Sequence, residues 1–165
     1  MTPMPHTIAV LCDLRDERGR VLLIRRAKEP NKGLYSPVGG KVEIALGESP
    51  AQAARRETLE EAGVDLPADR FRLAGLVTER GYLGQGHWLM FVYRCLEPVS
   101  APERTIREGA LEWHEPSALD RLPLPETDRR VIWPLIFEHQ GGFFAVHIDC
   151  TGDDLRWDVE EASGR

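Results

Sequence analysis

Residues 40–64 read GKVEIALGESPAQAARRETLEEAGV, and this stretch carries the strongest local signal in the chain. Ser49 can cap a helix, a proline follows at the first helical position, and Gln52 completes a capping box. Gly63 provides the left-handed residue at which such a helix ends. Because the residues between are rich in Ala, Arg, Glu and Leu, the pattern predicts a helix over residues 50–62.

Three acidic side chains share one face of this predicted helix. Each helical residue advances by about 100°, so Glu57, Glu60 and Glu61 should fall within an arc of roughly 100°. Arg56 stands one turn before Glu60 and can hold its carboxylate. Such an arc is either a solvated charged face or a divalent-cation site. Oxygen ligands without a nearby histidine favour Mg²⁺ or Mn²⁺ over zinc.

The whole stretch resembles the signature of the Nudix hydrolases, GX5EX7REUXEEXGU, in which U is a bulky apolar residue. The positions that match in register are Glu48, Arg56, Glu57, Glu60, Glu61, Gly63 and Val64. Two positions depart from the signature. Seven residues rather than five separate Gly40 from Glu48, and Thr58 stands where the family usually has an aliphatic residue.

The resemblance implies a fold, an activity and a set of site residues. The fold would be the α/β class of the family: a single domain over residues 1–165, built as an α/β/α sandwich around a central mixed β-sheet with a C-terminal β-hairpin. The family cleaves a nucleoside diphosphate linked to another group, with Mg²⁺ or Mn²⁺ as cofactor. The implied catalytic residues are Glu48, Arg56, Glu57, Glu60, Glu61 and Glu108. The implied metal ligands are the carbonyl of Gly39 and the side chains of Glu57, Glu60, Glu61 and Glu108.

Glu108 stands for a loop glutamate that relatives use to bind metal or as a general base. Glu103 and Glu112 are rivals for this role. Glu112 should face solvent if Leu111 and Trp113 face inward. The alternative for all three is an ordinary solvated loop acid.

Residues 23–41 resemble the corresponding part of the bacterial MutT members of the family. Those enzymes hydrolyse oxidised purine nucleoside triphosphates to the monophosphate and pyrophosphate. Arg25 matches a phosphate-contacting position, and Lys41 adds a positive charge nearby. The alternative is that Arg25 and Arg26 simply alternate outward at the end of a strand.

Residues 124–159 resemble the tail of the animal MutT homologue, in which two acids before the last helix read the base. Glu126 and Asp128 are the matching substrate-binding candidates. An acid there also suits a helix N-terminus on electrostatic grounds alone. Ser36, a further candidate, replaces an asparagine that contacts the base edge, and Leu124 replaces a stacking aromatic.

Two other functions stay open beside a triphosphate diphosphatase. Tyr82 lies near a position where members acting on dinucleoside polyphosphates carry a tyrosine, so a dinucleoside polyphosphate is one alternative substrate. ADP-ribose or a nucleotide sugar is another, although the proline expected of ADP-ribose members is missing there. A nucleotide-sensing module without turnover would typically have lost the signature acids, which this chain retains.

The rest of the chain predicts a mixed α/β arrangement. The first two strands flank a turn at residues 16–19 and read as a hairpin, and the last two form a terminal hairpin. A second helix is expected over residues 126–139, and loops over 27–37 and 98–109. The expected strands cover residues 7–12, 21–24, 71–77, 88–93, 110–113, 143–148 and 155–159.

Composition sets the remaining expectations. The 165 residues are 42% hydrophobic and 29% charged, which fits one folded domain. The net charge of −6 disfavours a nucleic-acid polymer and leaves a small nucleotide as the expected partner, bound by a monomer or homodimer. With no basic leader and no long apolar run, we expect no membrane partner and a cytoplasmic location. The cysteines form no CxxC pair and are expected to be free thiols.

Overall fold

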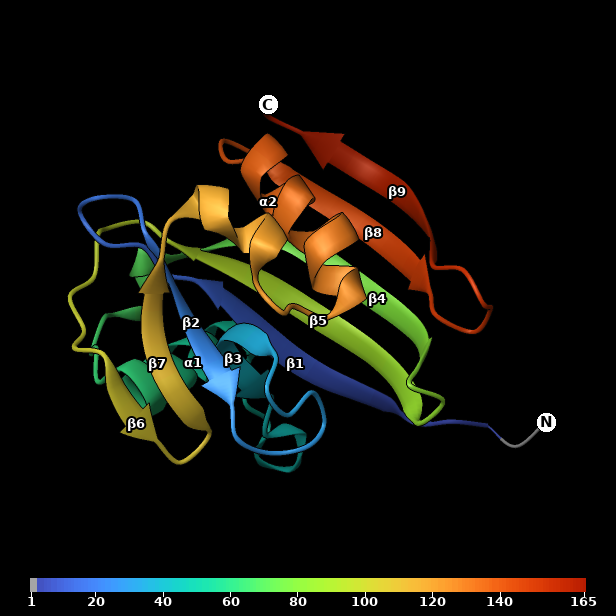
Figure 1. The fold of residues 1–165 in the computed structure, drawn as a ribbon, viewed down its shortest axis with the longest axis horizontal. Helices are drawn as coiled ribbons and strands as arrows, with labels where there is room; N and C mark the ends of the chain where they lie inside the picture. The colour runs from blue at the N-terminus through green and yellow to red at the C-terminus, as the bar shows by residue number, and fades with distance from the viewer. Residues whose placement is uncertain (1–2) are drawn as a thin grey trace.

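The structure is a computed structural model that describes residues 3–165, and within them nine strands form one mixed sheet (Figure 1). The strands are β1 (His6–Asp13), β2 (Val21–Arg26), β3 (Tyr35–Lys41), β4 (Phe71–Tyr82), β5 (Gly86–Cys95), β6 (Arg104–Ile106), β7 (Gly109–His114), β8 (Phe143–Asp149) and β9 (Arg156–Ser163). Their order across the sheet is β6-β7-β2-β3-β1-β5-β4-β8-β9. The β1–β5 and β4–β8 pairs are parallel and the other neighbours antiparallel, so the predicted mixed sheet is confirmed.

Helical segments cover both faces of the sheet, which confirms the predicted sandwich (Figure 1). One region is α1 (Pro50–Glu57) followed by a π-helical segment, η2 (Thr58–Ala62). The other is a π-helical segment, η5 (Asp128–Ile132), followed by α2 (Trp133–Glu138). Both predicted helices are therefore present, and each contains a widened turn. Short 3-10 turns are η1 (Ile44–Leu46), η3 (Ala68–Arg70) and η4 (Pro116–Arg121).

The alternation of side chains along β2 divides the core into two layers. Leu22 and Ile24 pack with α1 on one face of the sheet. Val21 and Leu23 pack with α2 on the other. Successive strand residues point to opposite faces, so one short apolar strand supplies both layers.

The first two strands do not form the predicted hairpin, because β3 lies between them. Residues 35–37 of β3 pair with β2, and residues 38–41 pair with β1. The expected loop over residues 27–37 therefore ends before Tyr35. The sequence does not predict β3 because proline and glycine residues interrupt the alternation of apolar and polar side chains. A side chain at Gly39 would collide with the Val10 carbonyl oxygen, so glycine allows β1 and β3 to approach here.

Three other boundaries differ from the sequence prediction. The expected loop over residues 98–109 contains the short edge strand β6. β4 continues to Tyr82 rather than ending at residue 77, and β9 continues to Ser163 rather than 159. In each case, pairing with a neighbouring strand extends a weak local pattern: β6 pairs with β7, the end of β4 with β5 and β8, and the end of β9 with β8. No helix within the described residues has the length and apolar character needed to cross a bilayer.

Candidate active site

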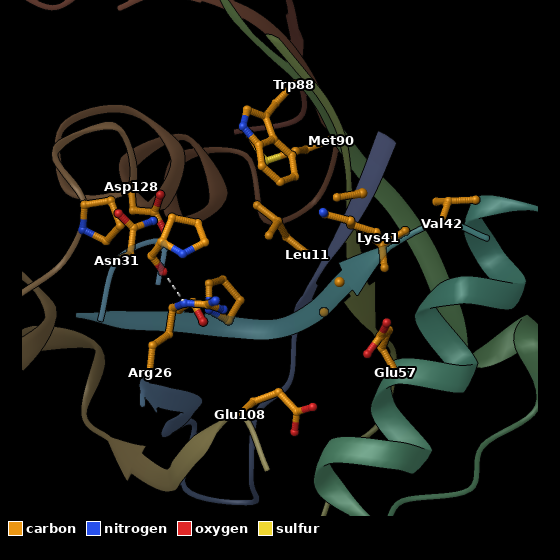
Figure 2. A pocket seen from close by; sticks show the side chains of 18 of the residues that line it. Leu11, Arg26, Asn31, Lys41, Val42, Glu57, Trp88, Met90, Glu108 and Asp128 are labelled. Atoms are coloured by element: carbon orange, nitrogen blue, oxygen red, sulfur yellow. Dashed lines mark hydrogen bonds between the residues drawn. The ribbon is translucent and has the colours of Figure 1, made fainter. Parts of the chain in front are cut away.

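A cavity of about 720 Å³ opens along β3 and is lined by segments far apart in the sequence. They include β1, β3, the α1–η2 region, β4, β5, the turn between β6 and β7, and the residues entering η5. Figure 2 shows Glu57 and Glu108 on one side of β3. Asp128, Trp88 and Met90 lie on the other side. The cavity therefore joins an acidic flank to a mainly apolar flank.

The acidic flank is built around two glutamates that face the glycines of β3. Glu61 is 3% exposed, and its Oε1 accepts a hydrogen bond of 2.8 Å from the Gly39 N–H. A side chain at Gly40 would collide with the carboxylate of Glu57. The two glycines thus let β3 lie directly against the helix that carries the acids.

Glu60 does not share this orientation, contrary to the predicted acidic arc. Its side chain is 58% exposed and approaches only the Nη1 of Arg56, at 3.4 Å. The cause is the π-helical segment η2, which begins immediately after Glu57. A π-turn holds more residues than an α-turn, so each residue advances by less than 100°. Glu61 is thereby directed to β3 and Glu60 to solvent.

Electrostatics on the acidic flank fit a divalent cation. Burial raises the pKa of Glu61 to about 8, and the charges of Glu57 and Glu108 add to this rise. Burial also raises the pKa of Glu57. Hard cations bind such oxygen donors, and the residues that would hold one are Glu57, Glu61, Glu108 and the Gly39 carbonyl. Within residues 3–165, no three acidic, His or Cys side chains cluster closely enough to hold an ion by themselves. Mg²⁺ typically combines one or two carboxylates with water and substrate phosphates.

Arg56 connects the acids of the signature. Its Nε and Nη2 donate to the carboxylate of Glu48 at 2.7 and 3.0 Å, and its Nη1 donates to Glu57 Oε1 at 2.9 Å. Its Nη2 also donates to the carbonyl of Lys41 at 3.1 Å. These hydrogen bonds lower the pKa of Glu48. Glu48 does not line the cavity, and it is linked to Glu57 through their shared contact with Arg56.

Comparison with known proteins identifies the family. A model of the NUDIX domain matches residues 4–133, which is most of the chain. The chain belongs to the Nudix family. A MutT Nudix hydrolase from Burkholderia pseudomallei is 29% identical, with a TM-score of 0.63 over 79% of this chain and 97% of that one.

Other relatives share the fold or part of the sequence. The MutT protein of Bacillus halodurans superimposes with a TM-score of 0.76 over 93% of this chain and 97% of that one, at 23% identity. The NUDIX domain of Shewanella oneidensis NrtR, solved with ADP ribose, gives 0.66 over 84% and 89%, at 19% identity. An octanoyltransferase of Myxococcus xanthus is 37% identical over 138 residues, 78% of this chain. The chain spans only 36% of the length of that curated relative.

The structure shows how this Nudix chain accommodates its two departures from the signature. The lengthened loop before Glu48 forms η1, whose Ile44 and Leu46 project into solvent. The loop thus bulges outward and leaves the contact between Glu48 and Arg56 in place. Thr58 is fully buried in the helix, where the family usually has an aliphatic side chain.

Three of the five expected substrate contacts of the Nudix chain line the cavity, and they are Ser36, Lys41 and Asp128. Arg25 is exposed and lies over the ring of Tyr35, with its guanidinium carbon 6.0 Å from the ring centroid. Its neighbour Arg26 lines the cavity instead, and its Nε donates to the Pro30 carbonyl at 2.7 Å (Figure 2). Arg26 takes the place expected of Arg25 because consecutive residues of β2 face opposite sides of the sheet.

The other expected contact, Glu126, points away from the cavity. Its side chain is exposed and forms an ion pair with Arg130, at 2.5 Å, one turn further along the helix. The contact is local, between positions i and i+4 on a solvent-facing surface. Of the two acids predicted to read the base, the structure therefore brings only Asp128 into the cavity.

Among the three acids proposed for the loop position, Glu108 alone lines the cavity. Glu103 accepts a hydrogen bond from the backbone N–H of Trp113 at 2.9 Å. Glu112 is half-buried rather than facing solvent as expected, and it accepts a hydrogen bond of 2.5 Å from the Tyr35 hydroxyl. Both rivals are therefore engaged elsewhere.

Glu79, which no sequence motif pointed to, lies on the wall of the cavity. It is 4% exposed, and burial raises its pKa to about 8, with the charge of Asp128 adding to the rise against the lowering effect of the Thr127 hydroxyl. The expected strand ended at Val77, two residues earlier. The sequence does contain a signal for this position. Glu79 stands two residues after the buried Val77, and residues two apart in a strand point to the same face.

The buried carboxyl of Glu79 should make stability depend on pH. Folding raises its pKa from a usual 4.5 to about 8, so its stabilising contribution is complete below the lower value and is lost as the pH rises through the upper one. Replacing it by neutral Gln should raise the free energy of unfolding at pH 8.5 by roughly 1–3 kcal/mol and change it little at pH 5. Thermal melts of Glu79→Gln at the two pH values measure this. The control is Glu138→Gln on the exposed end of α2, and an equal shift at both pH values would contradict the prediction.

Proposed function

We propose that this Nudix enzyme is a Mg²⁺-dependent diphosphatase that cleaves a nucleoside triphosphate to the monophosphate and pyrophosphate. An oxidised purine nucleotide such as 8-oxo-dGTP is the proposed substrate. The observation that carries the proposal is that the acidic flank and an apolar flank containing Trp88 and Met90 belong to one cavity. An acidic flank suits a cation-bound polyphosphate, and an apolar flank suits the flat face of a base.

In this proposal the residues of the cavity have different roles. Glu57, Glu61 and Glu108 bind the cation, and the solvent-facing Glu60 is a further ligand. When bound, Mg²⁺ neutralises the phosphates and lowers the pKa of a water molecule. Arg56 positions Glu57.

Arg26 and Lys41 lie in the cavity lining, where their positive charges can bind the phosphate oxygens. The water attacks phosphorus in line with the leaving group, and Glu108 is the proposed proton acceptor. Pyrophosphate leaves, and the nucleoside monophosphate remains.

A second candidate is hydrolysis of a dinucleoside polyphosphate or of ADP-ribose or another nucleotide sugar. Tyr82 lines the cavity, and its hydroxyl donates to Asn31 Oδ1 at 2.9 Å, so a second ring system would meet a fixed aromatic side chain. The Shewanella domain with a similar fold was solved with ADP ribose. A sensing role without turnover has less support, because Glu57, Glu60 and Glu61 are all present.

A substrate panel tests the proposal. The purified chain with Mg²⁺ is incubated with 8-oxo-dGTP, the ordinary triphosphates, ADP-ribose and diadenosine tetraphosphate, and the products are separated by ion exchange. We expect pyrophosphate and monophosphate from triphosphates, with kcat/KM at least about tenfold above that for the other classes. Faster cleavage of ADP-ribose or the dinucleotide would assign the second candidate.

We further propose that residues 1–165 form one functional domain whose partner is a small nucleotide rather than a nucleic-acid polymer. The net charge of −6 supports this view. A cytoplasmic location, and a monomer or homodimer, complete the proposal.

A further inference from the structure

A second, smaller cavity of about 240 Å³ opens where the parallel strands β1 and β5 both end (Figure 1). Its lining shares no residue with the cavity that holds the acidic flank. The polar side chains on its wall are Arg15, Asp16, Arg94, Glu97 and Gln140. This cavity is therefore separate from the candidate active site, and its chemistry is set by two arginines.

The two arginines share a single buried carboxylate. Asp13 stands opposite Arg94 in the register of β1 and β5 and is 2% exposed. Arg15 binds this carboxylate through Nε and Nη2, at 3.0 and 2.9 Å. The Nε of Arg94 lies 3.8 Å from the oxygen that Arg15 Nη2 contacts, which is beyond hydrogen-bond distance. One negative charge thus faces two positive charges.

Arg94 has N–H groups that the protein does not satisfy. Within residues 3–165, its Nε is the only atom of a charged side chain that is buried without a hydrogen-bond partner. Its Nη2 donates to the carbonyl of Ile136, in α2, at a long 3.4 Å. Burial lowers the pKa of Arg94, and the charges of Arg15 and Arg72 add to this effect while Asp13 opposes it. A buried guanidinium with unpaired donors is costly unless an acceptor reaches it.

Arg15 is already held in a fixed position. Besides its contact with Asp13, its guanidinium carbon lies 5.3 Å from the centroid of the Phe137 ring, so the group packs against an aromatic side chain of α2. A guanidinium that is ordered before binding loses little conformational entropy when it meets an anion.

The two acids on the wall differ in how far their charge is balanced. The carboxylate of Asp16 accepts from the backbone N–H groups of Arg18 and Arg20, at 3.0 and 2.9 Å, and from Arg20 Nε at 2.7 Å. Glu97 forms no ion pair within the described part of the chain, residues 3–165. Asp16 is therefore neutralised, and Glu97 is the group whose charge opposes an anion.

We propose that Arg15 and Arg94 form a binding site for a phosphate-type oxyanion, separate from the active site. A phosphoryl group carries up to two negative charges and at least three acceptor oxygens, so it can accept from both guanidinium groups at once. A carboxylate would bring one charge and two oxygens, which Asp13 already supplies. The free phosphate ion and the phosphoryl group of a small ester share this chemistry.

Isothermal titration in metal-free buffer of low ionic strength tests the proposal. The wild-type protein is titrated with inorganic phosphate, ribose 5-phosphate and acetate. We expect saturable binding of at least one of the two phosphates, roughly tenfold tighter than that of acetate. Tighter binding of ribose 5-phosphate would assign the site to an ester, and tighter binding of inorganic phosphate to the free ion. No saturable binding of either would overturn the proposal.

Two variants locate the bound phosphate. Arg15→Gln should weaken its binding at least about tenfold, because it removes one of the two guanidinium groups. Arg26→Gln, in the active-site cavity, should leave binding at this second site unchanged. A loss of binding in Arg26→Gln with none in Arg15→Gln would place the phosphate in the active-site cavity and overturn the proposal.

A third variant should bind phosphate more tightly than the wild-type protein does. Glu97→Gln removes the opposing charge and should raise the affinity roughly threefold. The matched control is Glu160→Gln on the exposed strand β9, which makes the same change of charge and should have no effect. If Arg15→Gln does not fold, Glu97→Gln decides, and unchanged or weaker binding by it would overturn the proposal.

Discussion

Glu61→Gln should lower kcat at least about a thousandfold and leave the fold intact. Glu61 faces β3, is 3% exposed, and shares the cavity with Glu57 and Glu108. Gln keeps the shape and the hydrogen bond from Gly39 but removes the negative charge that a cation needs. Since burial raises the pKa of Glu61 to about 8, the neutral side chain should not destabilise the protein in metal-free buffer.

Pyrophosphate release and a thermal melt measure the two parts of this prediction. Glu60→Gln should cost less, about tenfold, because the π-turn directs Glu60 to solvent. Glu138→Gln serves as the unchanged control. Near-normal turnover by Glu61→Gln would remove the proposed role of the acidic flank, whereas equal losses at both positions would favour the arc expected of a regular α-helix.

Removing divalent cations should be as severe as losing Glu61. With excess EDTA we expect turnover to fall at least about a thousandfold, because the polyphosphate would meet the acidic flank without neutralisation. Excess Mg²⁺ should restore it, and Mn²⁺ should replace Mg²⁺. Steady-state rates in chelator-treated and cation-restored samples provide the measurement.

Cation binding can also be measured without turnover. Mg²⁺ should raise the Tm of the wild-type protein, because a ligand of the folded state stabilises it by mass action. The shift should grow from pH 6 to pH 8, since the carboxylates must lose their protons to bind. Glu61→Gln should show a much smaller shift. Full activity in EDTA, with no effect of Mg²⁺ on Tm, would contradict a metal-dependent mechanism.

The sequence alone determined the features that depend on near neighbours. The capping box of α1 is present as expected, with Gln52 N–H donating to the Ser49 hydroxyl at 3.2 Å and the Ser49 N–H donating to the Gln52 side chain at 2.9 Å. Gly63 ends the helical region in the left-handed conformation. These contacts span only a few residues, so residue type and spacing suffice to predict them. The family signature is equally local, which is why it identified the fold.

Only the tertiary structure decided which side chains share the cavity. β3 lies between β1 and β2, and this placement brings Gly39 and Gly40 against Glu61 and Glu57. The π-turn that turns Glu60 outward has no counterpart in the periodicity of its sequence.

The side chains on the apolar flank of the cavity are brought together by elements that are far apart in the sequence. Glu79 meets Asp128 only because β4 continues beyond its apolar core and η5 lies over the sheet. Strand register and the winding of a packed helix are set by contacts between distant segments, so a local pattern does not contain them. For this protein, the chemistry of the helix was readable in the sequence, whereas the partners that complete the site came from the fold.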